Sequence, residues 1–515
     1  MTTAQDGGSD ALSVVLTRPA TSSLNSTAFV TAEGETWSAD EFTGLVLAIA
    51  EFFAARGLVA GDRLAVLLPK GIPALAALFA GLRTGVAVVP IDVSSPASRM
   101  AHLLADCAPG LVVTDDVHRE QFAGAVAPHP VSTFGADLPL TAQPARAAGL
   151  LAKPHSGEQP AYILYTSGTT GVPKGVVISR AALAAFLEAA IERAGYDDTT
   201  VFLSFFPMHF DPVLMEVLAP WGTGGRTVLF TRMTMVNDLV TVLAAHGVTD
   251  FSCTPNVVSM LSGRFSSYSA ERVPTLRSVW FGGEVPRVHD IRAFQLRSPG
   301  VRLFNGYGPT ECTVACSLFE VPDLRDDPAP GPLSIGTPMA GTEFALVSPE
   351  MTEVADGSAG ELLVSGAQVM IGYWGVADAE ANGMVRWRGN RWFRTGDLVH
   401  RAAGRYHFDG RRSRLIKIRG YRVHPDEVER ALESVGSVRE AVVVPDPSGT
   451  HLVAVVEVDT AQGAPTGSEL VACVGALVPS YMVPQRIIVE DRIPRTSGGK
   501  IDMAAVTARA RTGAA

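Results

Sequence analysis

The chain has 515 residues, a hydrophobic content of 47% and a net charge of −10. Its length allows three to four domains at roughly 150 residues each, and its composition is ample for several buried cores. The negative charge argues against nonspecific nucleic-acid binding, which needs a basic face. We therefore expect a multidomain protein without a nucleic-acid partner.

Neither the N-terminal residues nor the cysteines indicate a secreted protein. Residues 1–13 are small and polar and lack the charged-then-apolar order of a signal peptide. No apolar run reaches the length that spans a bilayer. The five cysteines show no CxxC or metal-ligand spacing, which favours free thiols over a disulfide scaffold or a zinc site. We expect a soluble, cytoplasmic protein with no membrane partner.

Helix and strand patterns alternate through the first part of the chain. The pattern predicts helices at 39–56, 72–84, 181–194, 213–221 and 235–246, and strands at 63–68, 87–91, 201–206 and 227–230. This alternation is typical of α/β proteins and indicates two related lobes. The Gly-rich segment 331–412 has short alternating strands and predicts a small β-rich subdomain.

The last hundred residues form a separate pattern. Strands are predicted at 416–418, 441–444 and 452–458, and helices at 425–434 and 467–477. This mixture indicates a compact α+β domain. The predicted organisation is therefore an N-terminal domain, 1–412, followed by a C-terminal domain, 413–515.

A glycine-rich loop, YTSGTTGVPKG at 165–175, lies between predicted strands at 161–165 and 176–178. Its glycines let backbone N–H groups converge on one anion, its hydroxyls add donors and its lysine adds a positive charge. The loop is not a Walker A sequence, because Lys174 follows Pro173 and precedes Gly175. It predicts a triphosphate-binding loop, and a polar surface turn is the alternative. The phosphate ligands would be Thr166, Ser167, Gly168, Thr169, Thr170 and Lys174.

Five further segments carry the resemblance to a known family. They are NGYGPTE at 305–311, GEL at 360–362, RTGDL at 394–398, GR at 410–411 before KIRGYR at 417–422, and GGK at 498–500. With the glycine-rich loop, and in this order, they resemble the motifs of the adenylate-forming superfamily over nearly the whole chain. The chain looks most like free-standing nonribosomal-peptide-type amino-acid adenylation enzymes and D-alanine–carrier-protein ligases.

The resemblance implies an ATP-dependent ligase that works in two steps. A carboxylate attacks the α-phosphorus of ATP and expels pyrophosphate, and a thiol then attacks the acyl adenylate. Catalytic roles are implied for Thr166, Glu311 and Lys500. Lys500 would bridge the attacking carboxylate and the α-phosphate, and Glu311 would hold Mg²⁺, a hard cation suited to carboxylate oxygen.

The remaining ATP contacts follow from the same motifs. Asp397 would accept hydrogen bonds from both ribose hydroxyls, since its two oxygens match two O–H donors, although a turn residue is the alternative. Tyr307 would offer a flat face to adenine. The other expected nucleotide-binding residues are Gly283, Glu284, Asn305, Gly306, Gly308, Thr310, Phe408 and Arg411. In the family the C-terminal domain is mobile and rotates between the two steps, and Ser413 stands at the hinge position, where Asp or Lys is usual.

The segment FPMHFD at 206–211 indicates the substrate class. Amino-acid-activating members of the family carry Phe-Asp here, and the aspartate pairs with the substrate ammonium. A buried carboxylate needs such a cation, and a structural salt bridge or a helix N-cap before Pro212 is the alternative role for Asp211. The other pocket positions transferred from the family are Met215, Ser252, Trp280, Gly282, Gly306, Val314 and Ala315. None is charged, which favours a small or medium uncharged amino acid, either α or β.

The acceptor is expected to be the phosphopantetheine thiol of a separate carrier protein, because no carrier segment follows residue 500. An acyl-CoA synthetase, with CoA as the thiol, is the alternative. A catalytically silent nucleotide-binding relative is disfavoured, because Lys174, Glu311, Asp397, Arg411 and Lys500 are all present.

Overall fold

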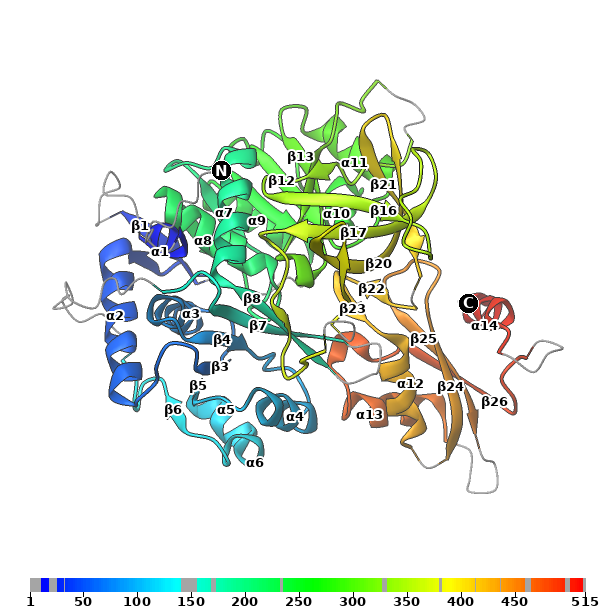
Figure 1. Cartoon of the computed structure of the whole chain (residues 1–515), viewed down its shortest axis with the longest axis horizontal. Coiled ribbons are helices and arrows are strands. Elements are labelled where there is room, and N and C mark those ends of the chain that lie inside the picture. The colour runs from blue at the N-terminus through cyan, green and yellow to red at the C-terminus, as the bar shows by residue number, and fades with distance from the viewer. Residues whose placement is uncertain are drawn as a thin grey trace. The chain divides into compact units, whose positions relative to one another are not determined.

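The structure, a computed structural model, describes residues 11–17, 26–31, 33–139, 155–167, 173–231, 235–326, 331–378, 382–412, 414–435, 437–458, 465–495 and 501–512. The chain divides into two units (Figure 1). The first unit contains residues 1–92, 106–164 and 175–410, and the second contains 93–105, 165–174 and 411–515.

A seven-stranded sheet forms the first α/β lobe and has the order β18-β8-β7-β4-β3-β5-β6. Within the run β7-β4-β3-β5-β6, adjacent strands are parallel. Apolar runs such as LAVL in β3 are buried throughout, as expected for parallel strands covered on both faces. The strands are β3 (Arg63–Leu67), β4 (Ala87–Pro90), β5 (Leu111–Thr114), β6 (Val131–Thr133), β7 (Pro160–Thr166), β8 (Lys174–Ser179) and β18 (Gly372–Tyr373). The helices of this stretch are α2 (Ala39–Ala55), α3 (Ile72–Thr84), α4 (Ala97–Cys107), α5 (Asp116–Gln121) and α6 (Ala123–Val126).

A nine-stranded sheet forms the second lobe and has the order β15-β14-β13-β12-β11-β9-β10-β1-β2. Its central strands, β1 and β9 to β13, are parallel to one another. The strands are β1 (Thr27–Val30), β2 (Thr36–Ser38), β9 (Val201–Ser204), β10 (Arg226–Leu229), β11 (Asp250–Cys253), β12 (Ser278–Gly282), β13 (Arg302–Tyr307), β14 (Ser317–Glu320) and β15 (Thr337–Pro338). The helices are α1 (Ala11–Leu16), α7 (Arg180–Ala194), α8 (Pro212–Thr223), α9 (Val236–Ala245), α10 (Pro255–Ser262) and α11 (Val288–Arg297). The two predicted α/β lobes are confirmed.

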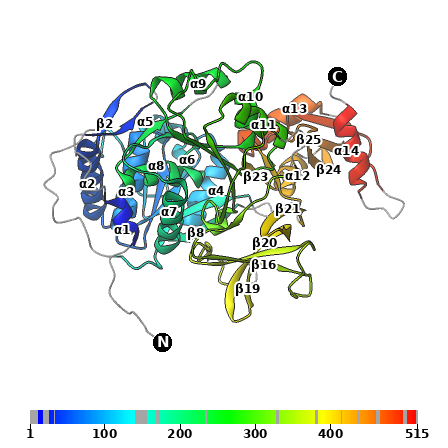
Figure 2. The same ribbon diagram turned by 90° about the horizontal axis from the view of Figure 1, so that it is seen from above.

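A buried aromatic cluster joins the two lobes. Phe29 of β1, Phe42 of α2 and Phe79 of α3 pack around Trp221 of α8, with ring centroids 4.4 to 6.3 Å apart. The indole N–H of Trp221 donates to the carbonyl of Leu16 at 2.9 Å, which satisfies its one polar atom. Elements that come from both sheets therefore share one core. Figure 2 shows the ribbon of α2, α3 and α8 from a second direction.

The predicted β-rich subdomain and the α+β domain are also confirmed. An antiparallel sheet pairs β16 (Thr342–Val347), β17 (Gly360–Gly366), β20 (Asn390–Ala402) and β19 (Met384–Trp387), and β21 (Arg405–Arg411) pairs with β20. The C-terminal elements are β22 (Ile416–Ile418), β23 (Tyr421–Val423), α12 (Pro425–Glu433), β24 (Val438–Pro445), β25 (Leu452–Val458), α13 (Gly467–Gly475), β26 (Arg486–Glu490) and α14 (Met503–Thr512). Strand β24 is longer than the predicted 441–444, because its pairing with β25 extends from Val438 to Pro445.

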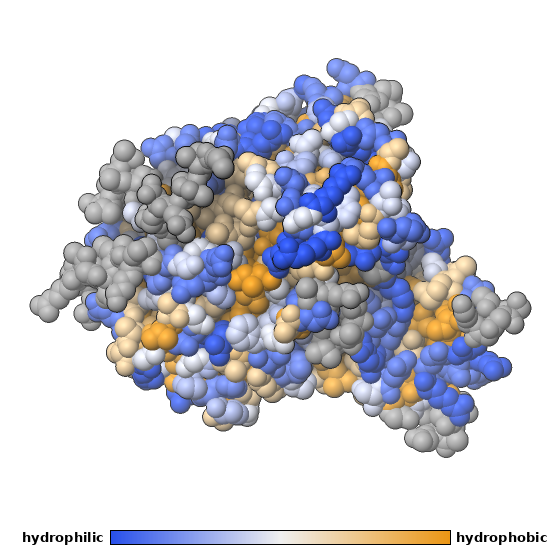
Figure 3. Space-filling view, in the orientation of Figure 1, coloured by the Kyte–Doolittle hydropathy of each residue, from blue (hydrophilic) through white to orange (hydrophobic). Residues whose placement is uncertain are grey.

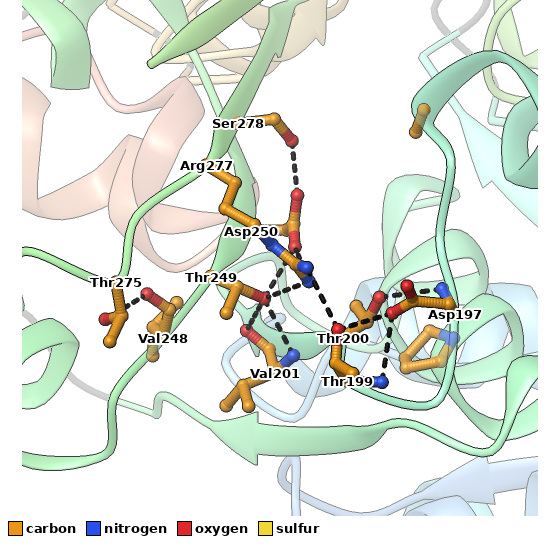
Figure 4. A network of polar contacts seen from close by, with 12 residues as sticks. Asp197, Thr199, Thr200, Val201, Val248, Thr249, Asp250, Thr275, Arg277 and Ser278 are labelled. Carbon is orange, nitrogen blue, oxygen red and sulfur yellow. Dashed lines mark hydrogen bonds and ion pairs between the residues drawn. The ribbon is translucent and has the colours of Figure 1, made fainter. Parts of the chain in front are cut away.

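A polar network ties together the amino ends of the central strands of the second lobe (Figure 4). Asp250, the first residue of β11, accepts hydrogen bonds from Ser278 Oγ at 2.5 Å and Thr249 Oγ1 at 2.6 Å. Thr249 also accepts from the Val201 amide at 2.8 Å, and Arg277 reaches Asp250 at 3.4 Å. This network therefore holds the amino ends of β9, β11 and β12 together, and open α/β sheets bind ligands at the opposite, carboxyl ends of their strands.

Hydrophilic residues and residues of intermediate hydropathy cover most of the face shown in Figure 3, with smaller hydrophobic areas among them. None of the helices in the described ranges combines the length and the apolar composition that crossing a membrane needs.

Candidate active site

Most of the predicted substrate and adenine residues lie at one edge of the nine-stranded sheet. They lie in or directly after β9, β11, β12 and β13, which are hydrogen-bonded neighbours. Their carboxyl ends therefore meet along one edge, which is where open α/β sheets bind ligands. The predicted residues that this edge brings together are Asp211, Ser252, Trp280, Gly282, Gly283, Glu284, Asn305, Gly306, Tyr307 and Gly308.

Asp211 precedes α8 and is half-buried. It occupies the N-cap position before Pro212, but its side chain makes no capping hydrogen bond. A capping role therefore does not explain why a carboxylate stands at this position. Burial raises the pKa of the Tyr162 hydroxyl well above its usual range, and the charge of Asp211 raises it further. The Asp211 carboxyl group thus lies near an almost fully enclosed phenol.

One turn further along α8, Glu216 is fully buried and anchors the helix to the sheet. Its carboxylate accepts hydrogen bonds from Ser204 Oγ at 2.9 Å, Ser252 Oγ at 2.5 Å and the Phe206 amide at 3.1 Å. These donors come from β9, from β11 and from the residues after β9. Glu216 therefore fixes the start of α8, which carries Asp211 and Met215, against two strand ends.

Lys70 supplies the cation of the same network. Its Nζ donates to the carbonyls of Ser204 at 2.7 Å and Phe206 at 3.0 Å. Burial raises the pKa of Glu216 to about 7 and lowers the pKa of Lys70 to about 8, and each charge partly offsets the effect of burial on the other. The ionisation of each of these two groups therefore depends on the charge of the other.

Three predicted pocket side chains are buried here. Met215 is 2% exposed, and Ser252 and Trp280 are each 4% exposed. The Ser252 hydroxyl donates to Glu216, so in this structure it serves the network under α8. The Trp280 ring packs against Phe304 and Tyr196, with centroids 5.5 and 6.3 Å away.

Gly282 and Gly306 face each other in β12 and β13. A Cβ on Gly282 would lie 2.5 Å from the Gly306 carbonyl oxygen, so the close approach of the two backbones requires glycine there. A Cβ on Gly306 would meet no atom closer than 3.8 Å. After Gly282, Gly283 has a positive φ of 85° and Glu284 is half-buried.

The NGYGPTE segment brings Tyr307 to Asp397. The Tyr307 hydroxyl donates to Asp397 Oδ2 at 2.6 Å, and Asp397 is fully buried between strands of the first unit. Asn305 Nδ2 donates to the Ser334 carbonyl at 2.9 Å, which holds the end of β13. A Cβ on Gly308 would lie 2.6 Å from the Ala315 Cα, so the chain folds back on itself here. The structure thus places the predicted adenine and ribose residues side by side.

Glu311 lies in the short helix η1 (Thr310–Cys312) and is 1% exposed. Its carboxylate accepts a hydrogen bond from the Tyr373 hydroxyl at 2.8 Å, and its carbonyl accepts from the Met370 amide at 2.8 Å. No cluster of three or more acidic, histidine or cysteine side chains fit for a metal occurs among the described residues. A single carboxylate still suits Mg²⁺, which binds through one or two carboxylates together with substrate phosphates and water.

The turn after η1 carries the last two pocket residues, Val314 and Ala315. Thr313 and Val314 have positive φ angles of 55° and 65°. Thr313 Oγ1 donates to the Gln368 carbonyl at 2.7 Å, and Gln368 Nε2 donates to the Ala315 carbonyl at 2.8 Å.

The remaining predicted residues belong to other parts of the structure. Phe408 is half-buried in β21. Thr166, Ser167, Lys174 and Arg411 belong to the second unit, where Ser167 Oγ donates to the Arg422 carbonyl at 2.7 Å. Four predicted site residues, Gly168, Thr169, Thr170 and Lys500, and the predicted hinge residue Ser413 lie outside the described residues.

Two α/β lobes, a β-rich subdomain and a C-terminal α+β unit make up the architecture of the adenylate-forming enzymes. The model of the AMP-binding enzyme family matches residues 16–374, and that of the AMP-binding enzyme C-terminal domain matches residues 427–500. The chain belongs to the AMP-binding enzyme family, which confirms the resemblance seen in the sequence.

Known relatives include both long and short proteins. The chain is 33% identical over 480 residues to the probable nonribosomal peptide synthetase CymA of Salinispora arenicola, covering 91% of this chain and 6% of that protein. It is 32% identical over 474 residues to an L-proline–[L-prolyl-carrier protein] ligase of Pseudomonas fluorescens, covering 90% of this chain and 92% of that one. The crystal structure of IdnL1 matches with a TM-score of 0.77 and 28% identity, over 91% of this chain and 96% of that chain.

Four residues at the site were not foreseen from the sequence: Lys70, Glu216, Gln368 and Tyr373. Glu216 had a visible signal, because it is the one acidic residue in the otherwise apolar helix α8. The other three are ordinary in their local sequence, and only their partners from distant segments reveal them.

Proposed function

We propose that this enzyme activates an amino acid with a small or medium, uncharged side chain. An oxygen of the substrate carboxylate would form a bond to the α-phosphorus of ATP as pyrophosphate leaves, giving an aminoacyl adenylate. The phosphopantetheine thiol of a separate carrier protein would then form a thioester as AMP leaves. The ligase of Pseudomonas fluorescens, whose name gives L-proline and a prolyl-carrier protein, supports both steps.

The position of Asp211 carries this proposal. Asp211 is the N-cap residue of α8, at the edge of the sheet where the strand ends meet. Glu216 holds α8 there through its hydrogen bonds to Ser204 and Ser252. The side chains proposed to line the pocket, Met215, Trp280 and Val314 among them, carry no charge. An ammonium group on the substrate would pair with Asp211, whereas a charged substrate side chain would find no partner among these residues. A β-amino acid would use the same carboxylate.

The nucleotide would be held by groups already close together in the first unit. Tyr307 would contact the adenine, and Asp397 would bind the ribose. The other proposed contacts in the segment of Tyr307 are Asn305, Gly306, Gly308 and Thr310. Glu311 would hold Mg²⁺, which neutralises phosphate charge when bound. Gly283, Glu284 and Phe408 complete the proposed nucleotide contacts of the first unit, and Arg411 of the second unit is a further proposed contact.

The residues of the second unit have roles in this proposal as well. Thr166, Ser167 and Lys174, with Gly168, Thr169 and Thr170, would grip the β- and γ-phosphates. Lys500 would reduce the repulsion between the attacking carboxylate and the α-phosphate. Because the reaction consumes ATP, we place it in the cytoplasm.

The test is amino-acid-dependent ATP–pyrophosphate exchange over a panel of α-amino, β-amino, aryl and fatty acids. We expect exchange with one small group of uncharged amino acids, and its loss in Asp211→Asn, which keeps the shape and removes the charge. Exchange only with acids that lack an amine, unchanged in Asp211→Asn, would refute the proposal. Thioester formation on CoA but not on a phosphopantetheinylated carrier protein would replace the carrier with CoA.

A further inference from the structure

The turn that carries Val314 and Ala315 has a backbone conformation that is unfavourable for the residue types in it. Thr313 and Val314 both adopt positive φ angles, 55° and 65°, in succession. Both are β-branched, and β-branched side chains are the least suited to the left-handed region. Such a backbone persists only where its surroundings impose it, and it is commonest at functional sites. A group outside the turn must therefore hold it.

Gln368 is in a position to hold the turn. It follows β17 and is fully buried. Its Nε2 donates to the Ala315 carbonyl at 2.8 Å, and its own carbonyl accepts from Thr313 Oγ1 at 2.7 Å. The turn is thus gripped on both sides of Val314 by one residue. Figure 1 shows β17 beside β16 in the β-rich subdomain. Gln368 therefore follows a strand of one sheet, whereas the turn that it bonds lies between β13 and β14 of the nine-stranded sheet.

The orientation of the Gln368 amide is fixed by its partners. The Ala315 carbonyl can only accept, so it selects the NH₂ group of the side chain. The opposite side-chain oxygen accepts from Thr342 Oγ1 at 2.8 Å. Two residues later, the Met370 amide donates to the Glu311 carbonyl at 2.8 Å. The segment after β17 thus holds the chain from η1 to the turn at three points.

We infer that Gln368 is a positioning residue that fixes the Thr313–Ala315 turn and, through Val314 and Ala315, sets which side chains the substrate pocket accepts. The inference rests on the proposed function, because it takes Val314 and Ala315 as pocket residues. A buried glutamine that only stabilises the fold is the competing explanation.

The experiment compares two glutamine-to-methionine variants. Gln368→Met keeps the volume and removes the side-chain hydrogen bonds. Gln295→Met is the matched control, because Gln295 is also buried and bonds the Pro322 carbonyl and the Leu324 amide, each at 2.9 Å, in the same unit. Both variants are measured with the amino acid that gives the fastest exchange in the wild type.

We expect Gln368→Met to raise the KM for that amino acid about tenfold, as for one lost hydrogen bond, and to accept amino acids that the wild type rejects. The KM for ATP should change less than twofold. Gln295→Met should lower thermal stability and leave both KM values unchanged. Equal KM values and equal substrate range in the two variants would overturn the inference and leave Gln368 a structural residue.

A second readout separates this inference from the proposed function. Hydrogen–deuterium exchange over residues 311–318 should be faster in Gln368→Met than in the wild type, because the Ala315 amide donates to the Thr313 carbonyl within the turn and the Cys316 amide donates to the Tyr307 carbonyl directly after it. Faster exchange without any amino-acid-dependent activity in the wild type would keep the positioning role and refute the proposed function. Unchanged exchange would refute the positioning role. Thr313→Val, which removes only the bond to the Gln368 carbonyl, replaces Gln368→Met if that variant does not fold.

Discussion

Replacing Lys70 with methionine should destabilise the first unit, and by an amount that depends on pH. The substitution removes the ammonium group that bonds the carbonyls of Ser204 and Phe206 and leaves Glu216 without its cation. At pH 7.5, between the pKa of Glu216 near 7 and that of Lys70 near 8, most of the carboxylate and most of the ammonium are charged, and the carboxylate is wholly buried. Leaving a buried charge without its compensating charge typically costs about 3–5 kcal/mol of unfolding free energy, and we expect a loss in this range.

At pH 6 the expected loss is smaller. The pKa of Glu216 is raised from 4.5 to about 7, so the folded state holds a proton that the unfolded chain releases between these values. The stability contributed by this group is therefore present at low pH and is lost as the pH rises through 7. At pH 6 the carboxyl is mostly neutral, and Lys70→Met loses only two hydrogen bonds, roughly 2 kcal/mol.

Urea unfolding of the wild type and Lys70→Met at pH 6 and pH 7.5, followed by tryptophan fluorescence, measures the difference. Lys70→Met with Glu216→Gln should recover stability at pH 7.5, because the buried charge is gone. Arg388→Met, which breaks an exposed ion pair with Glu353, is the control and should cost less than about 1 kcal/mol at either pH. An equal loss for Lys70→Met at both pH values would refute the coupling between Lys70 and Glu216.

Three further variants test other parts of the structure. Gly282→Ala should cost about 1–3 kcal/mol and reduce exchange activity, because its Cβ would collide with the Gly306 carbonyl; thermal unfolding and exchange assays check this. Asp250→Ala should cost about 2–3 kcal/mol in urea unfolding but leave the KM values unchanged, because its network lies at the other end of the strands. Tyr307→Phe should raise the KM for ATP roughly fivefold to tenfold, because Asp397 loses a hydrogen bond; an unchanged value would separate this pair from nucleotide binding.

The sequence predicted the fold well because the signals for strands and helices are local. The run at 63–68 and the amphipathic pattern at 39–56 each identify an element without knowledge of its neighbours. The motif at 305–311 likewise located the segment that meets Asp397. The element bounds were less accurate, because pairing with a neighbouring strand or helix decides where an element ends.

The sequence could not predict the contacts that hold the site. Lys70 and Glu216 are linked because both bond to Ser204, and neither position in the sequence indicates the other. Ser252 was assigned to the pocket, and only the structure shows its hydroxyl bonded to Glu216. Gln368 stands in an ordinary stretch, and its importance depends on the backbone angles of Thr313, which no sequence pattern encodes.

The approach of β12 to β13 at Gly282 limits how the pocket can be redesigned. Main-chain atoms make up this part of the sheet edge, and no side chain of any size can be added at Gly282 without separating the strands. Under the proposed function, changes in substrate range are better sought at Met215 on α8 or at Val314 and Ala315 on the turn. A library that varies these three positions and keeps Gly282 fixed would avoid the loss of stability that a side chain at Gly282 causes.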